Sequence, residues 1–186
     1  GFKVTSGGSN VAVGGLALQG LTTGLTGSTN TAVGYQAGVN ISGASSLNTL
    51  IGAYAGSGAS FTGSNNTFLG YEAGLNTSTG SDNTFVGYDA GQTNTTGRYN
   101  IRLGMGSDGV SNTDSSIVIG YFGAATANNQ LIVGSNSLNG EIYDAYFGQG
   151  VTDSSPVGIT LNATGGSGTN NTGGNLTIAG GKGTGN

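Results

Sequence analysis

Three polar residues occupy equivalent positions in copies of a repeated segment, each directly after a tyrosine. They are Gln36, Glu72 and Asp89. If neighbouring copies stack as adjacent strands, Glu72 and Asp89 lie about 4.8 Å apart along the stack, near the carboxyl separation of retaining glycosidases. The sequence offers no evident substrate cleft beside them, and exposed acids on a repeat are ordinary solubilising residues. We therefore expect no catalytic residues and a non-enzymatic protein.

The composition argues against several other classes of function. The chain has 186 residues, with 4 Lys and Arg, 8 Asp and Glu, no His and no Cys. Four scattered basic residues cannot form a stripe that follows a phosphate backbone, so we expect no nucleic-acid partner. Sites that need Cys or His are absent, and no calcium-binding G-G-x-G-x-D repeat occurs, so we expect no cofactor and no metal site. No apolar run reaches membrane-spanning length, so we expect no membrane insertion.

An internal repeat dominates the chain. Its clearest copy, N-T-A-V-G-Y-Q-A-G, spans residues 30–38, and related copies begin at Asn48, Asn66 and Asn83. Each copy has a short strand pattern followed by turn residues. The repeat glycines are spaced 20 residues apart at first and 14 at the end: Gly14, Gly34, Gly52, Gly70, Gly87, Gly104, Gly120, Gly134 and Gly148. This period predicts an all-β parallel β-solenoid (a β-roll) of short rungs over residues 1–150.

Alternation along each strand predicts which side chains fill the solenoid. The residue before each of the first eight repeat glycines is a branched aliphatic, so we expect this column to form the rung core. The residue one place earlier points the other way and is mostly apolar, which predicts a surface that binds further copies of the chain. The expected core column is Val13, Val33, Ile51, Leu69, Val86, Leu103, Ile119 and Val133. The expected interface between copies of the chain is Leu50, Phe68, Phe85, Val118 and Ile132.

Other aligned residues also have structural interpretations. A column of asparagines predicts a side-chain amide ladder: Asn30, Asn48, Asn66, Asn83 and Asn100. Packing at an interface explains the repeated tyrosines more simply than stacking on sugars does: Tyr35, Tyr71, Tyr88 and Tyr121. A single threonine column, which we expect to be partly internal, argues against an ice-binding face: Thr31, Thr49, Thr67 and Thr84. Arg98 and Arg102 are expected to pair with neighbouring acids and fix the rung register.

The pattern changes after residue 150. Ile159-Thr160-Leu161 is echoed by Leu176-Thr177-Ile178, and glycine-rich stretches follow both. Residues 151–186 are therefore expected to form a second glycine-rich β-repeat region. An uncapped solenoid leaves open sheet edges, so we expect the natural chain to continue at both ends.

The unit at residues 30–38 and its copies at 48, 66 and 83 resemble the head repeats of trimeric autotransporter adhesins, and stretches of bacteriophage tail-fibre and other virion-fibre proteins. The resemblance implies a homotrimeric left-handed parallel β-roll. It further implies a segment of a virion tail fibre, which acts as a rod or spacer and presents a distal host-recognition tip. The implied partners are neighbouring fibre or virion proteins and a host-surface glycan or protein. The alternatives are an adhesin head on a bacterial cell surface and, after it, a glycan-degrading tailspike. Adhesin heads have nearly constant rungs, whereas these rungs shorten along the chain.

Overall fold

The computed structural model describes residues 8–20, 24–58 and 60–134. The chain divides into two units, Gly1–Tyr143 and Asp144–Asn186, and all described residues belong to the first. The expected second repeat region, 151–186, lies outside them, as does the ninth repeat glycine. Within the described ranges the regular structure is entirely β, and no helix is present that could cross a membrane.

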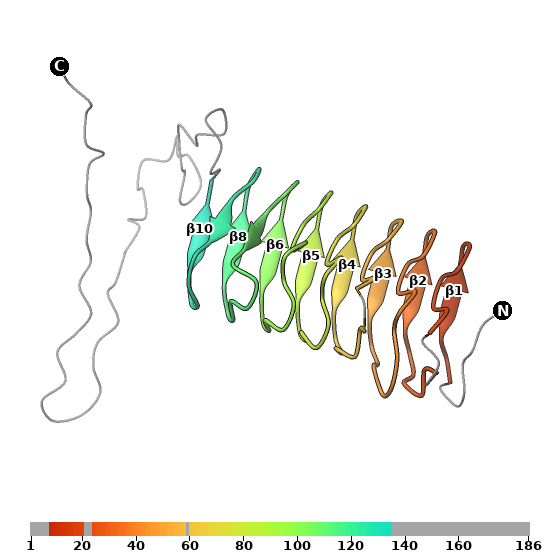
Figure 1. Ribbon diagram of the computed structural model, residues 1–186. Coiled ribbons are helices and arrows are strands. Elements are labelled where there is room, and N and C mark those ends of the chain that lie inside the picture. Colours follow the sequence, from red (N-terminus) through yellow and green to blue (C-terminus); the bar gives the residue numbers. More distant parts are fainter. Residues whose placement is uncertain (1–7, 21–23, 59, 135–186) are drawn as a thin grey trace, which may run out of the picture. The chain divides into compact units, whose positions relative to one another are not determined.

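Eight short strands form one parallel sheet in which each strand pairs with the next along the stack (Figure 1). The strands are β1 (Val11–Val13), β2 (Thr31–Val33), β3 (Thr49–Ile51), β4 (Thr67–Leu69), β5 (Thr84–Val86), β6 (Ile101–Leu103), β8 (Ile117–Ile119) and β10 (Leu131–Val133). A second parallel sheet pairs β7 (Asp108–Gly109) with β9 (Ala124–Ala125). Because the chain returns to the large sheet after each circuit, it forms a β-solenoid of about 7 turns. The predicted fold is confirmed.

The repeat stacks in register, residue upon equivalent residue. Leu50 pairs with Phe68 and Ile51 with Leu69 between β3 and β4, and equivalent positions of the repeat pair in the same way across the whole large sheet. The repeat glycines stack in the same way. Gly34 has a φ of 140°, and a Cβ there would lie 2.5 Å from the carbonyl oxygen of Gly52. A side chain at this position would therefore force neighbouring rungs apart.

The two faces of the large sheet are the reverse of those expected from the sequence. The column expected to form a homotrimer interface points inward: Leu50, Phe68, Phe85 and Val118 are fully buried within the single chain, and Ile132 on the last strand is half-buried. The column expected to form the core points outward. Its members Val13, Ile51, Leu69, Ile119 and Val133 are exposed, and Val33, Val86 and Leu103 are half-buried.

The opposite wall of the solenoid explains why the variable column lies inside. That wall consists of the alanine and glycine that end each repeat unit, such as Ala73 and Gly74. A Cβ added at Gly74 would lie 2.5 Å from the Phe68 ring, so the large inward side chain fills the space left by small residues. Phe68 also stacks on Phe61 and Phe85, with ring centroids 6.0 and 4.9 Å apart.

The predicted asparagine ladder is confirmed, and it runs through the interior. Asn66 donates from its backbone N and its Nδ2 to Oδ1 of Asn48, at 3.0 and 3.1 Å. Its Nδ2 also donates across the rung to the Gly80 carbonyl at 3.0 Å. Asn83 repeats the same contacts toward Asn66. The ladder therefore links neighbouring rungs and also closes each rung upon itself.

The interior becomes more polar as the rungs shorten. The continuous apolar core extends from Ala17 to Ala90. Beyond it the buried side chains include Asn94, Arg102, Ser107 and Thr113. Arg102 occupies the place of a ring there and donates to Thr113 Oγ1 and Ser116 Oγ, whereas Val118 and Ala125 farther on are apolar and fully buried.

The inward face can be tested with two substitutions on β4. Phe68→Ala should lower the free energy of unfolding by about 3–5 kcal/mol, because it opens a cavity between Phe61 and Phe85. Thr67→Ala, on the same strand but pointing outward, should change it by less than about 0.5 kcal/mol. Urea denaturation followed by circular dichroism measures both. Equal losses would contradict the assignment of the faces.

The ladder can be tested at its centre. Asn66→Ala should lower the free energy of unfolding by about 3 kcal/mol or more, because the Gly80 carbonyl and the amides of Asn48 and Asn83 lose buried partners. Asn76→Ala is the matched control, since its Nδ2 donates only at the surface, to the Gln92 carbonyl at 2.8 Å. A small loss at Asn66 in the same denaturation experiment would show that the ladder is dispensable.

Candidate interaction surface

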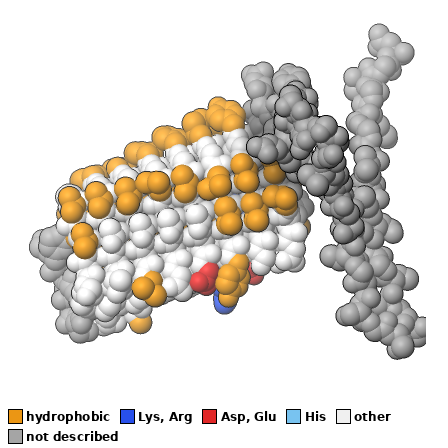
Figure 2. All heavy atoms as spheres, turned by 180° about the vertical axis from the view of Figure 1, so that it is seen from behind, with side chains coloured by type: hydrophobic (Ala, Val, Ile, Leu, Met, Phe, Trp, Pro, Cys, Tyr) orange, Lys and Arg blue, Asp and Glu red, His pale blue; other side chains and the backbone are white. Residues whose placement is uncertain are grey.

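The outward face of the large sheet carries two columns of side chains. One is the aliphatic column from Val13 to Val133. The other contains threonine in β2 to β5 and Val11, Ile101, Ile117 and Leu131 in the remaining strands. The threonines point outward, whereas the sequence predicted that they are partly internal, so that prediction is wrong. Thr67 is exposed, and Thr31, Thr49 and Thr84 are half-buried. We call these two columns the outward sheet face. None of its residues is charged, and Figure 2 shows hydrophobic side chains in rows along the stack.

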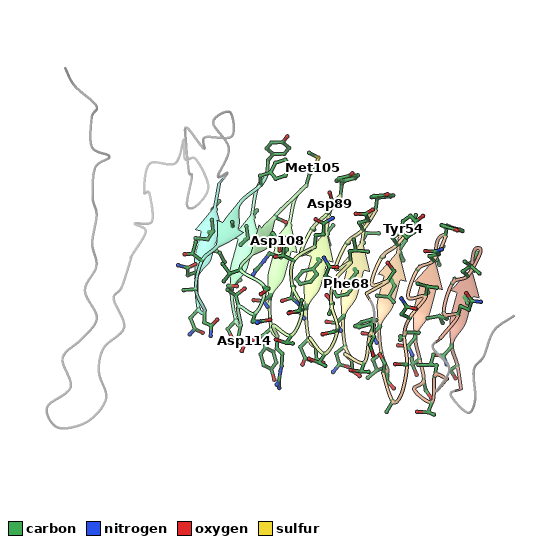
Figure 3. All side chains as sticks on the ribbon, viewed as in Figure 1. Tyr54, Phe68, Asp89, Met105, Asp108 and Asp114 are labelled. Carbon is green, nitrogen blue, oxygen red and sulfur yellow. The ribbon has the colours of Figure 1, made fainter. Side chains whose placement is uncertain are left out.

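A row of tyrosines borders this face, just beyond the repeat glycines. Tyr35, Tyr54, Tyr71 and Tyr88 follow one another with ring centroids 5.5, 5.8 and 5.2 Å apart. Three of them are well exposed, at 49% for Tyr35, 40% for Tyr71 and 51% for Tyr88. We call these four residues the tyrosine row. Figure 3 shows Tyr54 along the same edge of the stack as Asp89 and Met105, with Phe68 inside.

Tyr54 was not among the tyrosines expected to align, because its repeat reads G-A-Y where the others read G-Y. The structure nevertheless places its ring between those of Tyr35 and Tyr71. Tyr121, which was expected to align, instead forms an edge-to-face pair with Phe122 at 4.6 Å. The row is therefore continuous over β2 to β5 and is replaced by a different pair near β8.

A row of hydrogen-bonding side chains lies next to the tyrosine row. Gln36, Glu72 and Asp89 each directly follow a tyrosine and have φ values of 57°, 54° and 54°. Gln36 Nε2 donates to the hydroxyl of Tyr35 at 3.1 Å. Glu72 accepts from Gln92 Nε2 at 3.0 Å. We call Gln36, Glu72, Asp89 and Gln92 the polar row.

The Glu72 carboxylate affects the pKa values of two neighbouring side chains. A hydrogen bond to the Glu72 carboxylate is the main reason that the pKa of Tyr71 rises to about 12. The pKa of Asp89 is also raised, first by desolvation and then by the negative charge of Glu72 in the neighbouring rung. The Oδ1 atom of Asp89 is buried and has no hydrogen-bond partner within the described residues. The charge of Glu72 therefore acts on Asp89, and Asp89 retains an unused acceptor.

The two arginines behave differently from each other. Arg102 replaces phenylalanine in the inward column, and its guanidinium donates to the carbonyl and hydroxyl oxygens of Ser116, both at 2.8 Å, and to Thr113 Oγ1 at 3.0 Å. Burial lowers its pKa to about 10, which the charge of Asp108 partly opposes. Arg98 contacts an acid through its backbone and not through its guanidinium: its backbone N donates to Asp114 Oδ1 at 2.6 Å. Neutral oxygens thus hold Arg102, in place of the ion pairs expected.

Within residues 8–20, 24–58 and 60–134, no three His, Cys, Asp or Glu side chains gather into a group that could hold a metal ion. What the surface does offer is aromatic rings, carboxylate and amide hydrogen-bonding groups, and an uncharged apolar sheet face.

Comparisons with protein-family models, with curated proteins and with solved structures found no match.

The Asp89 carboxyl should make stability depend on pH. Because its pKa is higher in the folded chain than the ordinary 3.8, the folded state binds this proton more tightly. Stability should therefore fall as the pH rises from about 3.8 through the raised pKa. Asp89→Asn should stabilise the protein at about pH 7, and its advantage should shrink at about pH 4.

Urea denaturation at a series of pH values measures this effect. Asp82→Asn is the matched control, because Asp82 has a similar φ of 59° but accepts a hydrogen bond from an amide, Asn65 Nδ2, at 3.1 Å. If Asp89→Asn showed the same difference from the wild type at every pH, the raised pKa of Asp89 in the folded chain would be wrong.

Proposed function

We propose that the solenoid is a non-enzymatic structural segment of a homotrimeric fibre, a rod or spacer that holds a distal host-recognition tip away from a virion tail. The observation that carries this proposal is the outward sheet face. It exposes aliphatic side chains along the full set of strands, with Val13 at 56% and Val133 at 51%. Contiguous apolar surface of this kind is typical of a protein–protein contact.

Copies of the same chain are the partner that fits this face best. The face repeats once per rung, about every 4.8 Å, so a partner must repeat at the same interval to contact every rung. A parallel copy placed in register meets that condition automatically. The face also carries no charge, so identical faces meet without repulsion between like charges. The interface column in this proposal is therefore the aliphatic one that includes Ile51, Leu69 and Ile119.

The size of the face favours more than one contact per chain. Eight rungs at about 4.8 Å span roughly 34 Å, and about five residues from the threonine to the tyrosine side span roughly 15 Å. Each face then offers roughly 500 Å², less than the roughly 800 Å² per partner of a standard interface. Three such faces around a common axis bury roughly 1,500 Å² in total but still roughly 500 Å² per chain, so a stable trimer requires each chain to make a further contact besides this face.

An adhesin head on a bacterial surface is the second candidate. It uses the same trimeric stack but binds its host ligand along the solenoid itself. The exposed tyrosine row favours this possibility, because a spacer has no need of exposed rings. In either case the segment acts outside the cell or on a virion, beside further fibre proteins.

Light scattering tests the proposed assembly. The wild-type chain should have about three times its chain mass of 18.0 kDa. Leu69→Asp should reduce the mass toward that of one chain while the β-sheet circular dichroism signal persists, because a charge on the outward sheet face opposes contact with another copy. Thr79→Asp, in the exposed turn between β4 and β5, is the control and should remain assembled.

Two outcomes would count against this account. A folded wild-type monomer would contradict the fibre proposal as a whole. A Leu69→Asp variant that keeps the wild-type mass would retain the oligomer but contradict the outward sheet face as its interface.

A further inference from the structure

The tyrosine row and the polar row together have the composition of a ligand site. The tyrosine row supplies aromatic rings in four successive rungs, with centroids 5.2 to 5.8 Å apart. The polar row supplies two carboxylates and two amides immediately beside those rings. Aromatic rings pack against the C–H faces of sugars, while carboxylates and amides bond their hydroxyl groups.

Hydrogen-bonding capacity remains unused in the polar row. The buried Oδ1 of Asp89 has no partner within the described residues. Such an atom costs free energy unless a donor reaches it. Because this oxygen is itself buried, a ligand on the surface does not reach it, and the polar row instead offers a ligand the half-buried side chains of Gln36, Glu72 and Gln92. Gln36 and Gln92 each donate one hydrogen bond through Nε2, and within the described residues their amide oxygens have no hydrogen-bond donor.

The charge of the site restricts the ligand. Glu72 and Asp89 are both acidic, and the described arginines lie elsewhere: Arg102 is buried inside the solenoid, and Arg98 follows the turn before β6. Anionic polymers would be repelled, whereas a neutral polyhydroxyl chain would not. The steps between rings, close to the length of one sugar unit in an extended chain, favour a linear ligand lying along the stack.

The site has defined ends. In the rung after Asp89 the equivalent residues are Met105 and Gly106, and in the next they are Tyr121 and Phe122. Neither rung supplies a carboxylate or amide at the polar position. Within the described residues, the rings run through the four rungs of β2 to β5, and a carboxylate or amide lies beside them in the rungs of β2, β4 and β5, because Tyr54 itself occupies the polar position in the rung of β3.

We propose that the tyrosine row and the polar row form an elongated binding site for a neutral linear glycan, which lies along the stack from Tyr35 to Tyr88. This function goes beyond that of a spacer and does not depend on it. The competing explanation is that the tyrosines extend the contact between copies of the chain.

Affinity electrophoresis of the full chain tests the proposal. Native gels are cast with laminarin, glucomannan or dextran as neutral probes and with alginate as an anionic probe. At least one neutral polysaccharide should retard the wild type, and alginate should not. Replacing Tyr71 and Tyr88 together by Ala should weaken that retardation at least roughly tenfold, because two ring contacts are lost.

Two further variants keep the test specific. Tyr121→Ala removes an equally placed, exposed tyrosine outside the row and should bind like the wild type. Replacing Tyr71 and Tyr88 by Phe keeps the rings and should retain most of the binding, which also separates loss of contact from loss of folding. Light scattering and circular dichroism are recorded for every variant.

The outcomes separate this site from the fibre proposal. Failure of every neutral probe to retard the wild type would overturn the glycan site and leave the trimer untouched. A fall in oligomeric mass for the Tyr71 and Tyr88 alanine variant would also overturn it, because the tyrosines would then belong to the interface between copies. Conversely, a monomer that is retarded by a neutral glycan would support the site while refuting the fibre.

Discussion

The buried asparagine ladder is the constraint on which the rest of the solenoid depends. An amide inside a protein must have its hydrogen bonds satisfied, and here the main partners of each one are the equivalent asparagine one rung away and a carbonyl across its own rung. This requirement fixes the stacking register and the distance between the two walls. The ladder ends where Ser116 takes the place of asparagine and donates to Asn100 Oδ1 at 2.8 Å. The buried Arg102 side chain lies next to Ser116 and donates to its hydroxyl oxygen at 2.8 Å, so the interior is polar where the ladder ends.

The period of the repeat was enough to predict the solenoid, but the assignment of the faces was wrong. The constancy of the aliphatic column suggested a core, although constancy on the outside has an equally physical cause if identical rungs present one continuous face. The ladder itself contained the missing signal. Asn48 and Leu50 are two residues apart and must share a face, so a buried Asn48 places Leu50 inside and Ile51 outside. The hydrogen bonds that bury the asparagines depend on carbonyls such as that of Gly80, which are distant in sequence.

The candidate surface was predictable in part. The equivalent positions of Glu72 and Asp89 follow directly from the repeat, and their carboxylates do influence each other. The role of Tyr54 was not predictable from alignment, because its ring reaches the tyrosine row from the neighbouring residue position. Arg102 was also misread, since a charged residue in an apolar column suggests the surface. Its burial requires the hydroxyl and carbonyl oxygens of Ser116, which only the folded rung brings within reach.

The same alternation that buries the asparagines determines what the surface can do. With one side of each strand occupied by the ladder and the inward column, the threonines and aliphatics must all face outward, and stacking in register turns them into a continuous strip. The tyrosines fall at the corner after the repeat glycine, where the chain leaves the strand, so they border this strip without lying on it. A flat apolar face suits a partner with the same repeat, whereas a corner lined by rings, carboxylates and amides suits a flexible polar chain. One short repeat therefore generates two adjacent surfaces of different chemistry, and association between copies can bury the first while leaving the second accessible.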